Sequence, residues 1–287
     1  YVAFSSTALI NAVEIKEDSV SKQATQIMQT LSEKIEPETE INFHAFALKD
    51  KFGIIETGRA EIFMDKIKTG LRKRKISCLK KGFKRDLPFL QILILGDRSI
   101  AVSYLAEEEM REYHSLISPF VGGFNNVADD KKAPSRAFKK IVEAQELLGV
   151  SISPGETLVD LGACPGGWSY IARKSGARVI ALDRSPLNPE LMQDKDVQFI
   201  KADAFKYEPK REIHWVVSDI IAAPERILEL LDYWVFGKKC KHFIFTIKFQ
   251  GHKDYGLLKK FKKAAAECGY NVILKQLNAN KNEVTIV

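Results

Sequence analysis

Hydrophobic positions repeat regularly in the C-terminal part of the chain and less regularly before it. After residue 133, short apolar runs alternate with segments of helical spacing, a pattern typical of parallel strands joined by crossover helices. Strands are predicted over Thr157–Asp160, Arg178–Leu182, Val197–Ile200, Trp215–Ser218, Phe243–Lys248, Asn271–Leu277 and Glu283–Val287. Helices are predicted over Pro134–Leu148 and Tyr255–Cys268. The pattern therefore predicts an α/β fold with a mostly parallel sheet.

The last two predicted strands are joined only by Asn278–Asn282. So short a connection requires antiparallel neighbours, because parallel strands need a crossover of a dozen or more residues. A parallel sheet that ends in such a hairpin is the topology of class I methyltransferases, which have a Rossmann-like fold.

The first ~125 residues mix predicted helices with paired strands, which indicates a smaller α+β domain. The helices are expected over Ser19–Ile35 and Arg59–Arg74, and the strands over Ile41–Ala47, Phe89–Leu95 and Ser99–Leu105, with a hairpin turn at Gly96–Arg98. Loop-forming residues concentrate between Ser118 and Ala133. We therefore expect two domains, 1–125 and 126–287.

Charge is distributed unevenly along the chain. The 287 residues include 44 Lys plus Arg and 37 Asp plus Glu, a net charge of +7. Ten basic residues and no acidic residue fall between Lys66 and Arg85, so the rest of the chain has 34 basic and 37 acidic residues. A localised basic surface is typical of a site for a polyanion such as RNA. The expected RNA contacts in this segment are Arg72, Lys73, Arg74, Lys75, Lys80, Lys81, Lys84 and Arg85.

This basic segment has a second interpretation, a solvated helix face followed by a loop. Phe83 and Phe89 lie nearby in the sequence, and they either stack on bases or pack in the core.

Several classes of protein are disfavoured. No apolar run reaches the ~18 residues of a membrane helix, and the first residues lack the features of a signal peptide. The four cysteines have no metal-ligand spacing, and the five histidines form no ligand set. We expect a cytoplasmic protein with no metal and no membrane partner.

The strongest motif is a glycine-rich turn between a predicted strand and a predicted helix. Such a turn lets a ligand approach the backbone and the helix N-terminus closely. An acidic residue precedes the first glycine by two positions, and the dinucleotide pattern G-x-G-x-x-G is absent. The residues expected to bind a cofactor here are Asp160, Gly162, Ala163, Cys164, Pro165, Gly166, Gly167 and Trp168.

Two further carboxylates follow the next two strands. Asp183 ends its strand where an acid can accept hydrogen bonds from ribose hydroxyls, and Asp203 follows the third strand. Each alone is an ordinary carboxylate at a strand end, but their register behind the glycine-rich turn favours cofactor binding.

If the chain is a class I methyltransferase, as its predicted topology suggests, the residues after the fourth strand restrict the kind of group that accepts the methyl. The segment Ser218–Pro224 lacks the D/N-P-P-Y/F pattern of amino-group methyltransferases. No cysteine lies beside Asp219 to act as the thiolate that methylation at carbon 5 of a pyrimidine requires. A hydroxyl acceptor needs a base or a cation instead, and four residues are candidates for this role: Lys140, Asp219, Lys248 and Glu283.

The turn D-L-G-x-x-P-G-G-W, the segment Ala133–Arg136 and the segment Asn282–Thr285 together resemble the FtsJ-type RNA methyltransferases, and most closely the RlmM group of large-subunit rRNA methyltransferases. The resemblance implies a class I methyltransferase domain preceded by an RNA-binding THUMP-like domain. It implies S-adenosylmethionine as the cofactor, with Asp219 also at its site, and RNA, in particular 23S rRNA, as the partner. Arg136 then contacts RNA. The order K-D-K-E resembles the family's catalytic tetrad for ribose 2′-O-methylation.

The resemblance implies a role for each member of this tetrad. Lys248 acts as base or cationic activator, Asp219 and Lys140 set its protonation and position, and Glu283 orients a lysine or the ribose. Two alternatives stay open: an inactive RNA-binding or assembly factor, and a methyltransferase with another acceptor, such as tRNA or a base.

Overall fold

The computed structural model describes residues 3, 5, 7–49, 53–55, 58–95, 98–125, 127–249, 251, 255–270 and 272–287, with the backbone alone at 48, 49, 53–55, 59 and 60. The chain divides into two compact units, Ser6–Asn125 and Asn126–Val287, and residues 1–5 belong to the second. The sequence pattern had placed residues 1–5 in the first domain. They group with the C-terminal unit because Ala3 is buried in its core and the Ala3 carbonyl accepts the Gln276 N–H at 2.7 Å.

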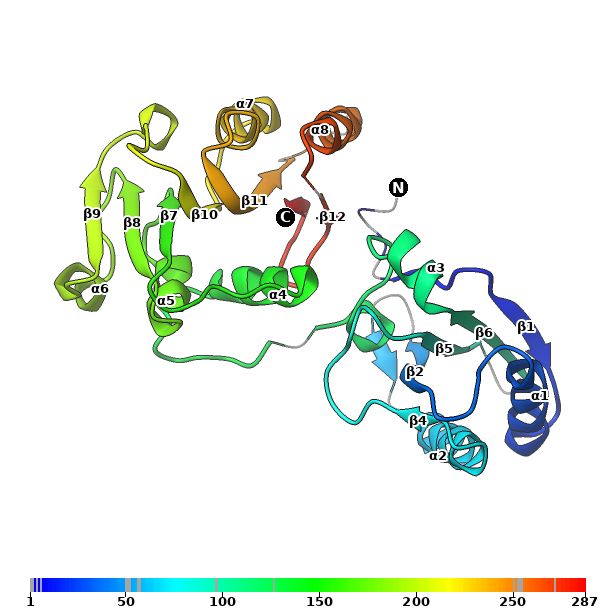
Figure 1. Ribbon diagram of the computed structural model, residues 1–287. Coiled ribbons are helices and arrows are strands. Elements are labelled where there is room, and N and C mark those ends of the chain that lie inside the picture. Colours follow the sequence, from blue (N-terminus) through cyan, green and yellow to red (C-terminus); the bar gives the residue numbers. More distant parts are fainter. Residues whose placement is uncertain are drawn as a thin grey trace. The chain divides into compact units, whose positions relative to one another are not determined.

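The N-terminal unit is an α+β structure (Figure 1). Its elements are β1 (Val13–Lys16), α1 (Val20–Ser32), β2 (Glu40–Lys49), β3 (Gly53–Ile55), α2 (Gly58–Lys73), β4 (Ser77–Cys78), β5 (Phe89–Ile94), β6 (Ser99–Leu105), α3 (Glu107–Glu112) and the 3-10 turn η2 (Val121–Gly123). The sheet order is β1-β6-β5-β2-β3, and β4 pairs with the start of β2. Residues 96 and 97 of the expected hairpin turn lie outside the described residues.

Helices α1 and α2 of this unit pack on each other and on one face of the sheet (Figure 1). Ile27 and Leu31 from α1 pack with Phe63, Ile67 and Leu71 from α2 in one hydrophobic core. All five side chains are fully buried. The helical spacing of these apolar residues is therefore the sequence feature that orients both helices toward the sheet.

The C-terminal unit is a seven-stranded sheet with helices on both faces (Figure 1). Its elements are α4 (Phe138–Leu148), β7 (Thr157–Leu161), α5 (Gly167–Lys174), β8 (Arg178–Asp183), α6 (Pro189–Gln193), β9 (Val197–Lys201), the 3-10 turn η3 (Ala204–Lys206), β10 (Ile213–Ser218), α7 (Pro224–Val235), β11 (Cys240–Lys248), α8 (Gly256–Glu267), β12 (Leu274–Lys275) and β13 (Glu283–Ile286). Helices α4, α5 and α6 pack on one face of the sheet, and α7 and α8 on the other.

The strand order is β12-β13-β11-β10-β7-β8-β9. The central strands pair in parallel, whereas β13 is antiparallel to β11 and to β12. The predicted mostly parallel sheet with a C-terminal antiparallel hairpin is confirmed. This order reverses direction at β7 and β10, so the ends of these two strands form the crevice in which open α/β sheets bind ligands.

Several predicted boundaries differ from the structure, and two elements of the C-terminal unit are clearly shorter than predicted. Helix α4 begins at Phe138 rather than at Pro134. Residues 135–137 form tight turns instead, because their carbonyls accept the N–H groups three residues farther along the chain. The predicted strand Asn271–Leu277 is reduced to β12, Leu274–Lys275, and residue 271 lies outside the described residues.

Candidate active site

The glycine-rich turn crosses from the end of β7 to the start of α5. Gly162 has φ +75° and Gly166 has φ +109°, a backbone conformation that other residues rarely adopt. The Gly162 and Ala163 N–H groups donate to the Leu182 carbonyl at 2.8 and 3.0 Å, which fixes the turn on the neighbouring strand. A Cβ on Gly162 would lie 2.3 Å from Ile220 Cγ1, so only glycine fits between this turn and the segment after β10.

A cavity of about 450 Å³ opens beside this turn. Most of the predicted cofactor residues line it, together with both predicted catalytic residues from the ends of β10 and β11. The predicted residues at the cavity are Asp160, Gly162, Ala163, Cys164, Pro165, Gly167, Trp168, Asp183, Asp219 and Lys248. Four lining residues were not predicted as part of the site: Ser135, Ala137, Ile220 and Ile221.

Two predicted cofactor residues are absent from the cavity wall. Gly166 is the N-cap residue of α5 and faces Leu191, since a Cβ on Gly166 would lie 2.3 Å from Leu191 Cδ1. The Asp203 carboxylate accepts the Phe205 N–H at 3.1 Å and so caps the turn η3. Its other oxygen lies 3.8 Å from Arg184. In this structure Asp203 therefore stabilises its own loop rather than lining the cavity.

Asp183 is oriented toward the cavity by the backbone around it. Its Oδ2 accepts the Cys164 N–H at 2.9 Å, and its Oδ1 accepts the Ser185 N–H at 2.9 Å. Each carboxylate oxygen has a second lone pair, so Asp183 can also accept hydrogen bonds from ligand hydroxyls.

Asp160 is the buried acid of the site. Its Oδ2 accepts hydrogen bonds from the Ser169 N–H at 3.0 Å and the Ser169 hydroxyl at 2.7 Å. Burial nevertheless raises the pKa of Asp160 to about 7, and the charges of Asp219 and Asp183 act in the same direction. A cation in the cavity would favour the ionised form of this carboxyl group.

The four predicted catalytic side chains form one continuous row of ion pairs. Lys248 Nζ lies 3.0 Å from Asp219 Oδ1 and donates to the Asp219 carbonyl at 2.6 Å. Lys140 Nζ donates to Asp219 Oδ1 and Oδ2 at 3.0 and 3.2 Å and to Glu283 Oε2 at 2.7 Å. Lys248 and Asp219 line the cavity. Lys140 and Glu283 do not line it; Lys140 contacts Asp219, and Glu283 contacts Lys140.

The fold places these residues by three independent means. Asp219 follows β10 and Lys248 ends β11, so parallel pairing brings them to the same edge of the sheet. Glu283 begins β13 directly opposite Lys248 in the antiparallel register. Lys140 reaches the same edge from α4.

The loop before β13 is attached to α4 by Glu143, one helical turn after Lys140. Glu143 is 4% exposed, and its two carboxylate oxygens accept the Asn278 N–H at 3.0 Å each. Its Oε1 also accepts Asn278 Nδ2 at 2.9 Å. Burial raises the pKa of Glu143. This contact was not predicted from the sequence, and it joins the two elements that carry Lys140 and Glu283.

The residues present fit a cationic cofactor. The cavity wall carries three acidic side chains, Asp160, Asp183 and Asp219, against one ammonium group, from Lys248, and a bound cation would favour the ionised form of Asp160. Gly167 and Ser135 both line the cavity, and a Cβ on Gly167 would lie 2.4 Å from Ser135 Oγ, so a larger residue does not fit there. Acidic side chains and a glycine-rich backbone that a ligand can approach closely suit a bound sulfonium compound.

The predicted RNA-contacting residues of the N-terminal unit separate into two sets. Four have partners in the fold: Arg74 donates to the Ser32 carbonyl at 2.7 Å, Arg85 to the His114 carbonyl at 3.3 Å, and Lys84 and Lys75 lie 3.2 and 3.9 Å from Glu40 and Glu38. Four others are exposed: Arg72, Lys73, Lys80 and Lys81. Arg136, in the C-terminal unit, is exposed beside the cavity residue Ser135.

The surface around the end of α2 is hollowed. Arg72, Lys75 and Lys80 line a 480 Å³ depression there together with Lys68, which was not predicted to take part. Phe89 is fully buried, and the Phe83 ring packs edge-on against it at 5.0 Å between centroids. Of the two interpretations of these aromatic residues, packing in the core is the one that the structure supports.

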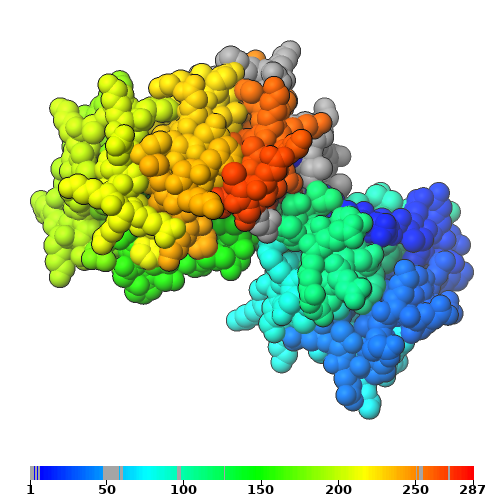
Figure 2. Space-filling view, turned by 45° about the horizontal axis from the view of Figure 1, so that its top comes forward, coloured from blue at the N-terminus to red at the C-terminus, as the bar shows by residue number. Residues whose placement is uncertain are grey.

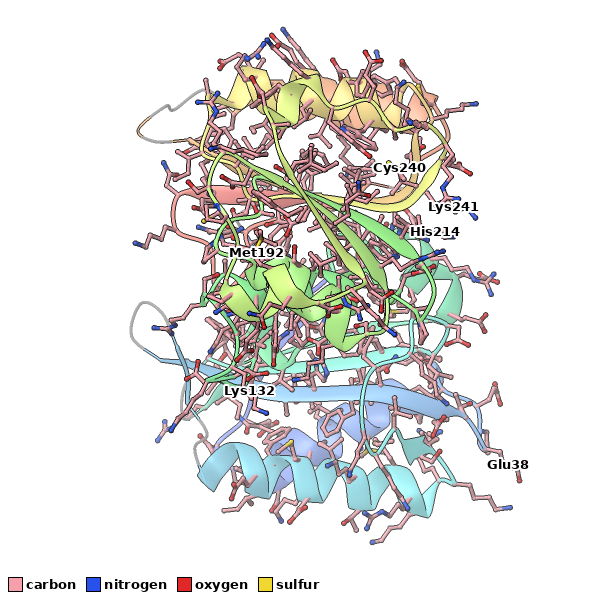
Figure 3. All side chains as sticks on the ribbon, turned by 90° about the vertical axis from the view of Figure 1, so that its left-hand side faces the viewer. Glu38, Lys132, Met192, His214, Cys240 and Lys241 are labelled. Carbon is pink, nitrogen blue, oxygen red and sulfur yellow. The ribbon has the colours of Figure 1, made fainter. Side chains whose placement is uncertain are left out.

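Apart from Cys164, no described cysteine or histidine lines the cavity. Figure 3 shows His214, Cys240 and Lys241 where β10 and β11 begin, at the sheet edge opposite Asp219 and Lys248. His214 Nδ1 accepts the Thr157 N–H at 3.2 Å. Within the described ranges, no group of three or more His, Cys, Asp or Glu side chains could hold a metal ion, and no described helix is long and apolar enough to cross a membrane.

Comparisons with known proteins agree with this geometry. The family model of FtsJ-like methyltransferases matches residues 133–278. The ribosomal RNA large subunit methyltransferase M of Pseudoalteromonas translucida is 32% identical over 239 residues, which cover 78% of this chain and 64% of that protein. The protein of the same name from Marinobacter nauticus is 36% identical over 169 residues, 57% of this chain and 46% of that protein.

Likeness to solved structures is more distant. The fibrillarin pre-rRNA processing protein of Methanococcus jannaschii matches with a TM-score of 0.38 and 15% identity, over 69% of this chain and 80% of that one. The assignment of the fold therefore rests on the strand order and on the family match.

The family match includes the glycine-rich turn and three of the four row residues, Lys140, Asp219 and Lys248. It confirms the predicted methyltransferase fold and, with it, S-adenosylmethionine as the cofactor. The chain therefore belongs to the FtsJ-like methyltransferase family.

Proposed function

We propose that this protein transfers a methyl group from S-adenosylmethionine to a ribose 2′-OH of RNA, and that the RNA is large-subunit rRNA. The observation that carries the proposal is the position of Lys248 Nζ, at the cofactor cavity and 3.0 Å from Asp219 Oδ1. The chain spans 64% of the first curated relative that it matches, so the activity of the whole relative is part of this proposal.

The cofactor, when bound, supplies an electrophilic methyl group on a sulfonium centre. Asp183 holds hydroxyl groups of the bound molecule, and the carboxylates of the wall favour its positive charge. The glycine-rich turn orients it through the main chain. These residues bind and position the cofactor. The row of ion pairs that includes Lys248 and Asp219 acts on the acceptor oxygen.

Lys248 is the residue that meets the acceptor oxygen. As an ammonium it has three N–H donors, and the Asp219 carboxylate and carbonyl take two of them. The third is available to a ribose 2′-oxygen at the cavity, where it stabilises the negative charge that develops on the oxygen as the hydroxyl proton passes to water. As a neutral amine, Lys248 Nζ receives that proton directly. Asp219 pairs with both lysines and so fixes the position of Lys248 Nζ, and Glu283 holds Lys140 in place.

Two kinds of observation support RNA as the substrate. The exposed cations Arg72, Lys73, Lys80 and Lys81 form a surface suited to phosphates on the N-terminal unit, for which we propose a THUMP-like role. The relatives at about 30% identity carry rRNA methyltransferase names. We further propose that the reaction takes place in the cytoplasm.

Location of the transferred methyl group tests the proposal. The purified protein is incubated with labelled S-adenosylmethionine and unmodified large-subunit rRNA transcripts, and the product is digested with nuclease and analysed by mass spectrometry. The proposal predicts a dinucleotide resistant to cleavage, because a 2′-O-methyl group blocks hydrolysis at the adjacent phosphate. A methylated base, or tRNA as the only substrate, contradicts it. Cofactor binding with no transfer to any RNA supports the inactive assembly factor instead.

A further inference from the structure

A second basic segment lies in the C-terminal unit. Between Gly237 and Lys263 the sequence has nine lysines and one acidic residue, Asp254. Four of these lysines belong to α8, whose 12 residues include a single acid, Glu267. The positive charge of the chain is therefore concentrated in two places, and the methyltransferase unit carries one of them.

Helix α8 presents its lysines to solvent. Leu258, Phe261 and Ala265 bury its inner side against the core, whereas Lys260, Lys262 and Lys263 are exposed. Lys263 lies 4.0 Å from Glu267 in an exposed pair, a contact that contributes little and leaves the cation accessible. In Figure 2, the orange surface of α8 lies open on this face of the unit.

The neighbouring helix shows that this charge is local. Helix α7 packs in the same layer as α8, and its exposed side carries Glu225, Glu229 and Asp232 against a single Arg226. Two adjacent helices of opposite charge indicate a boundary between a surface that attracts a polyanion and one that repels it.

The start of α8 adjoins the charged row. Tyr255 directly precedes the helix, and its ring lies 4.6 Å from that of Phe249, the residue after Lys248. The Tyr255 hydroxyl donates to Asn282 Oδ1 at 3.4 Å, beside Glu283. With a rise of 1.5 Å per residue, the three lysines lie roughly 6–11 Å along the axis from the first residue of α8. The helix therefore starts beside the row of ion pairs, and its three lysines follow within about two turns of that start.

We propose that Lys260, Lys262 and Lys263 bind phosphates of the substrate RNA next to the nucleotide that is methylated. The inference rests on the proposed function, because a ribose that reaches Lys248 must carry its flanking phosphates along the rim of the cavity. It adds an RNA-binding surface to the methyltransferase unit itself. Each phosphate contact releases condensed counterions, so this surface must contribute to the salt dependence of RNA binding.

The test compares two triple variants of the full chain with the wild type. The first is Lys260→Gln/Lys262→Gln/Lys263→Gln. The matched control, Lys195→Gln/Lys206→Gln/Lys210→Gln, removes the same charge from exposed lysines of the same unit, near the edge strand β9. Affinity for an unmodified large-subunit rRNA transcript is measured by filter binding at several salt concentrations, and cofactor affinity by calorimetry.

We expect the α8 variant to bind RNA about tenfold more weakly or worse, and the slope of log affinity against log salt to fall in magnitude by about 2. The control should keep the wild-type slope, and both variants should keep their cofactor affinity. An unchanged slope for the α8 variant, or an equal change in the control, overturns the proposal. Loss of binding to anionic lipid vesicles with RNA affinity unchanged would assign the surface to membranes instead.

The binding assay also separates this proposal from the proposed function. If the α8 variant loses salt-dependent RNA binding but the wild type methylates no ribose, the surface stands and the proposed reaction fails. If the wild type methylates rRNA and the α8 variant binds it normally, the surface fails and the reaction stands.

Discussion

Lys140 Nζ lies 2.7 Å from Glu283 Oε2, although 143 residues separate the two along the chain. The same ammonium group also donates to both carboxylate oxygens of Asp219. The Lys140 side chain is 8% exposed, so its charge is compensated by these two carboxylates rather than by water. A substitution at any of these residues therefore changes the contacts of the others, and it alters the position of Lys248 through Asp219.

The contact between Glu143 and Asn278 should act on catalysis through position alone. Glu143→Gln replaces one of two acceptor oxygens with a donor that faces the Asn278 N–H. We expect kcat to fall about tenfold with both KM values unchanged, because a shifted loop displaces Glu283 from Lys140. The pH profile of kcat should move as well, which loss of folded protein alone would not cause.

A control for this variant lies on the same helix. Glu146→Gln changes an exposed residue of α4 and should leave kcat and its pH profile as in the wild type. If Glu143→Gln keeps wild-type kcat, or if its loss is matched by Glu146→Gln, the positioning role of Glu143 is wrong.

Gly162→Ala should weaken cofactor binding, because the added Cβ displaces Ile220 in the cavity wall. The added Cβ would lie 2.3 Å from Ile220 Cγ1, in the wall of the cavity. Gly155→Ala is the matched control, because Gly155 has φ +81° but nothing within 4 Å of the added Cβ. Both variants should lose roughly 1–2 kcal/mol of stability from backbone strain, and Gly162→Ala should lose more because its Cβ overlaps Ile220. Only Gly162→Ala should weaken cofactor binding, at least tenfold by calorimetry, and equal affinities in the two variants would contradict the account.

Asp160 should make the protein less stable as the pH rises toward neutrality. Burial raises the pKa of its carboxyl group from 3.8 to about 7, so between these values the folded chain keeps a proton that the unfolded chain releases. The contribution of Asp160 is thus fully present below pH 4 and is lost as the pH rises through 7, by up to about 4 kcal/mol. Asp160→Asn cannot ionise and should lack this dependence.

Urea unfolding at pH 5, 6, 7 and 8 measures this effect. The stability of Asp160→Asn relative to the wild type should increase from pH 5 to pH 7 and then level off. A difference that stays constant over the whole range would show that Asp160 is ionised in the folded protein throughout.

The basic segment of the N-terminal unit should divide into binding and structural residues. Arg72→Gln/Lys73→Gln/Lys80→Gln/Lys81→Gln removes exposed cations and should weaken RNA binding and flatten its salt dependence, with little change in Tm. Arg74→Gln removes the hydrogen bond to the Ser32 carbonyl and should lower Tm by a few degrees, with a small effect on binding. Unchanged RNA affinity in the quadruple variant would contradict the assignment of this surface.

Sequence periodicity predicts the C-terminal sheet well because its strands are short apolar runs. It misses β1, since only Ile15 of Val13–Lys16 is buried and the rest of this edge strand faces solvent. It overextends the strand at 271–277, where pairing in the structure is limited to Leu274–Lys275. Apolar patterning reports burial on a face, and an edge or bent strand lacks a uniform face.

The candidate site could be predicted only where a motif placed it. Lys140, Asp219, Lys248 and Glu283 follow the order of a known family, and the structure brings them together. Gly166 was predicted from its place in the glycine-rich turn and Asp203 from its place after the third strand, yet their local contacts direct both away from the cavity.

Glu143 was missed because a single glutamate on a helix is usually at the surface. A signal for it was present all the same. Lys140, Glu143 and Leu147 share one face of α4, and two charges on a predicted apolar face indicate a buried polar contact.

Lys248 is the residue on which the proposed reaction depends most directly. The decisive measurement is single-turnover methyl transfer to an rRNA transcript by the wild type, Lys248→Ala and Lys248→Arg, with cofactor affinity determined in parallel. We expect Lys248→Ala to bind S-adenosylmethionine within about twofold of the wild type and to transfer methyl at least ~100-fold more slowly. Near-normal turnover by Lys248→Ala would contradict the central claim that this amine acts on the ribose 2′-OH.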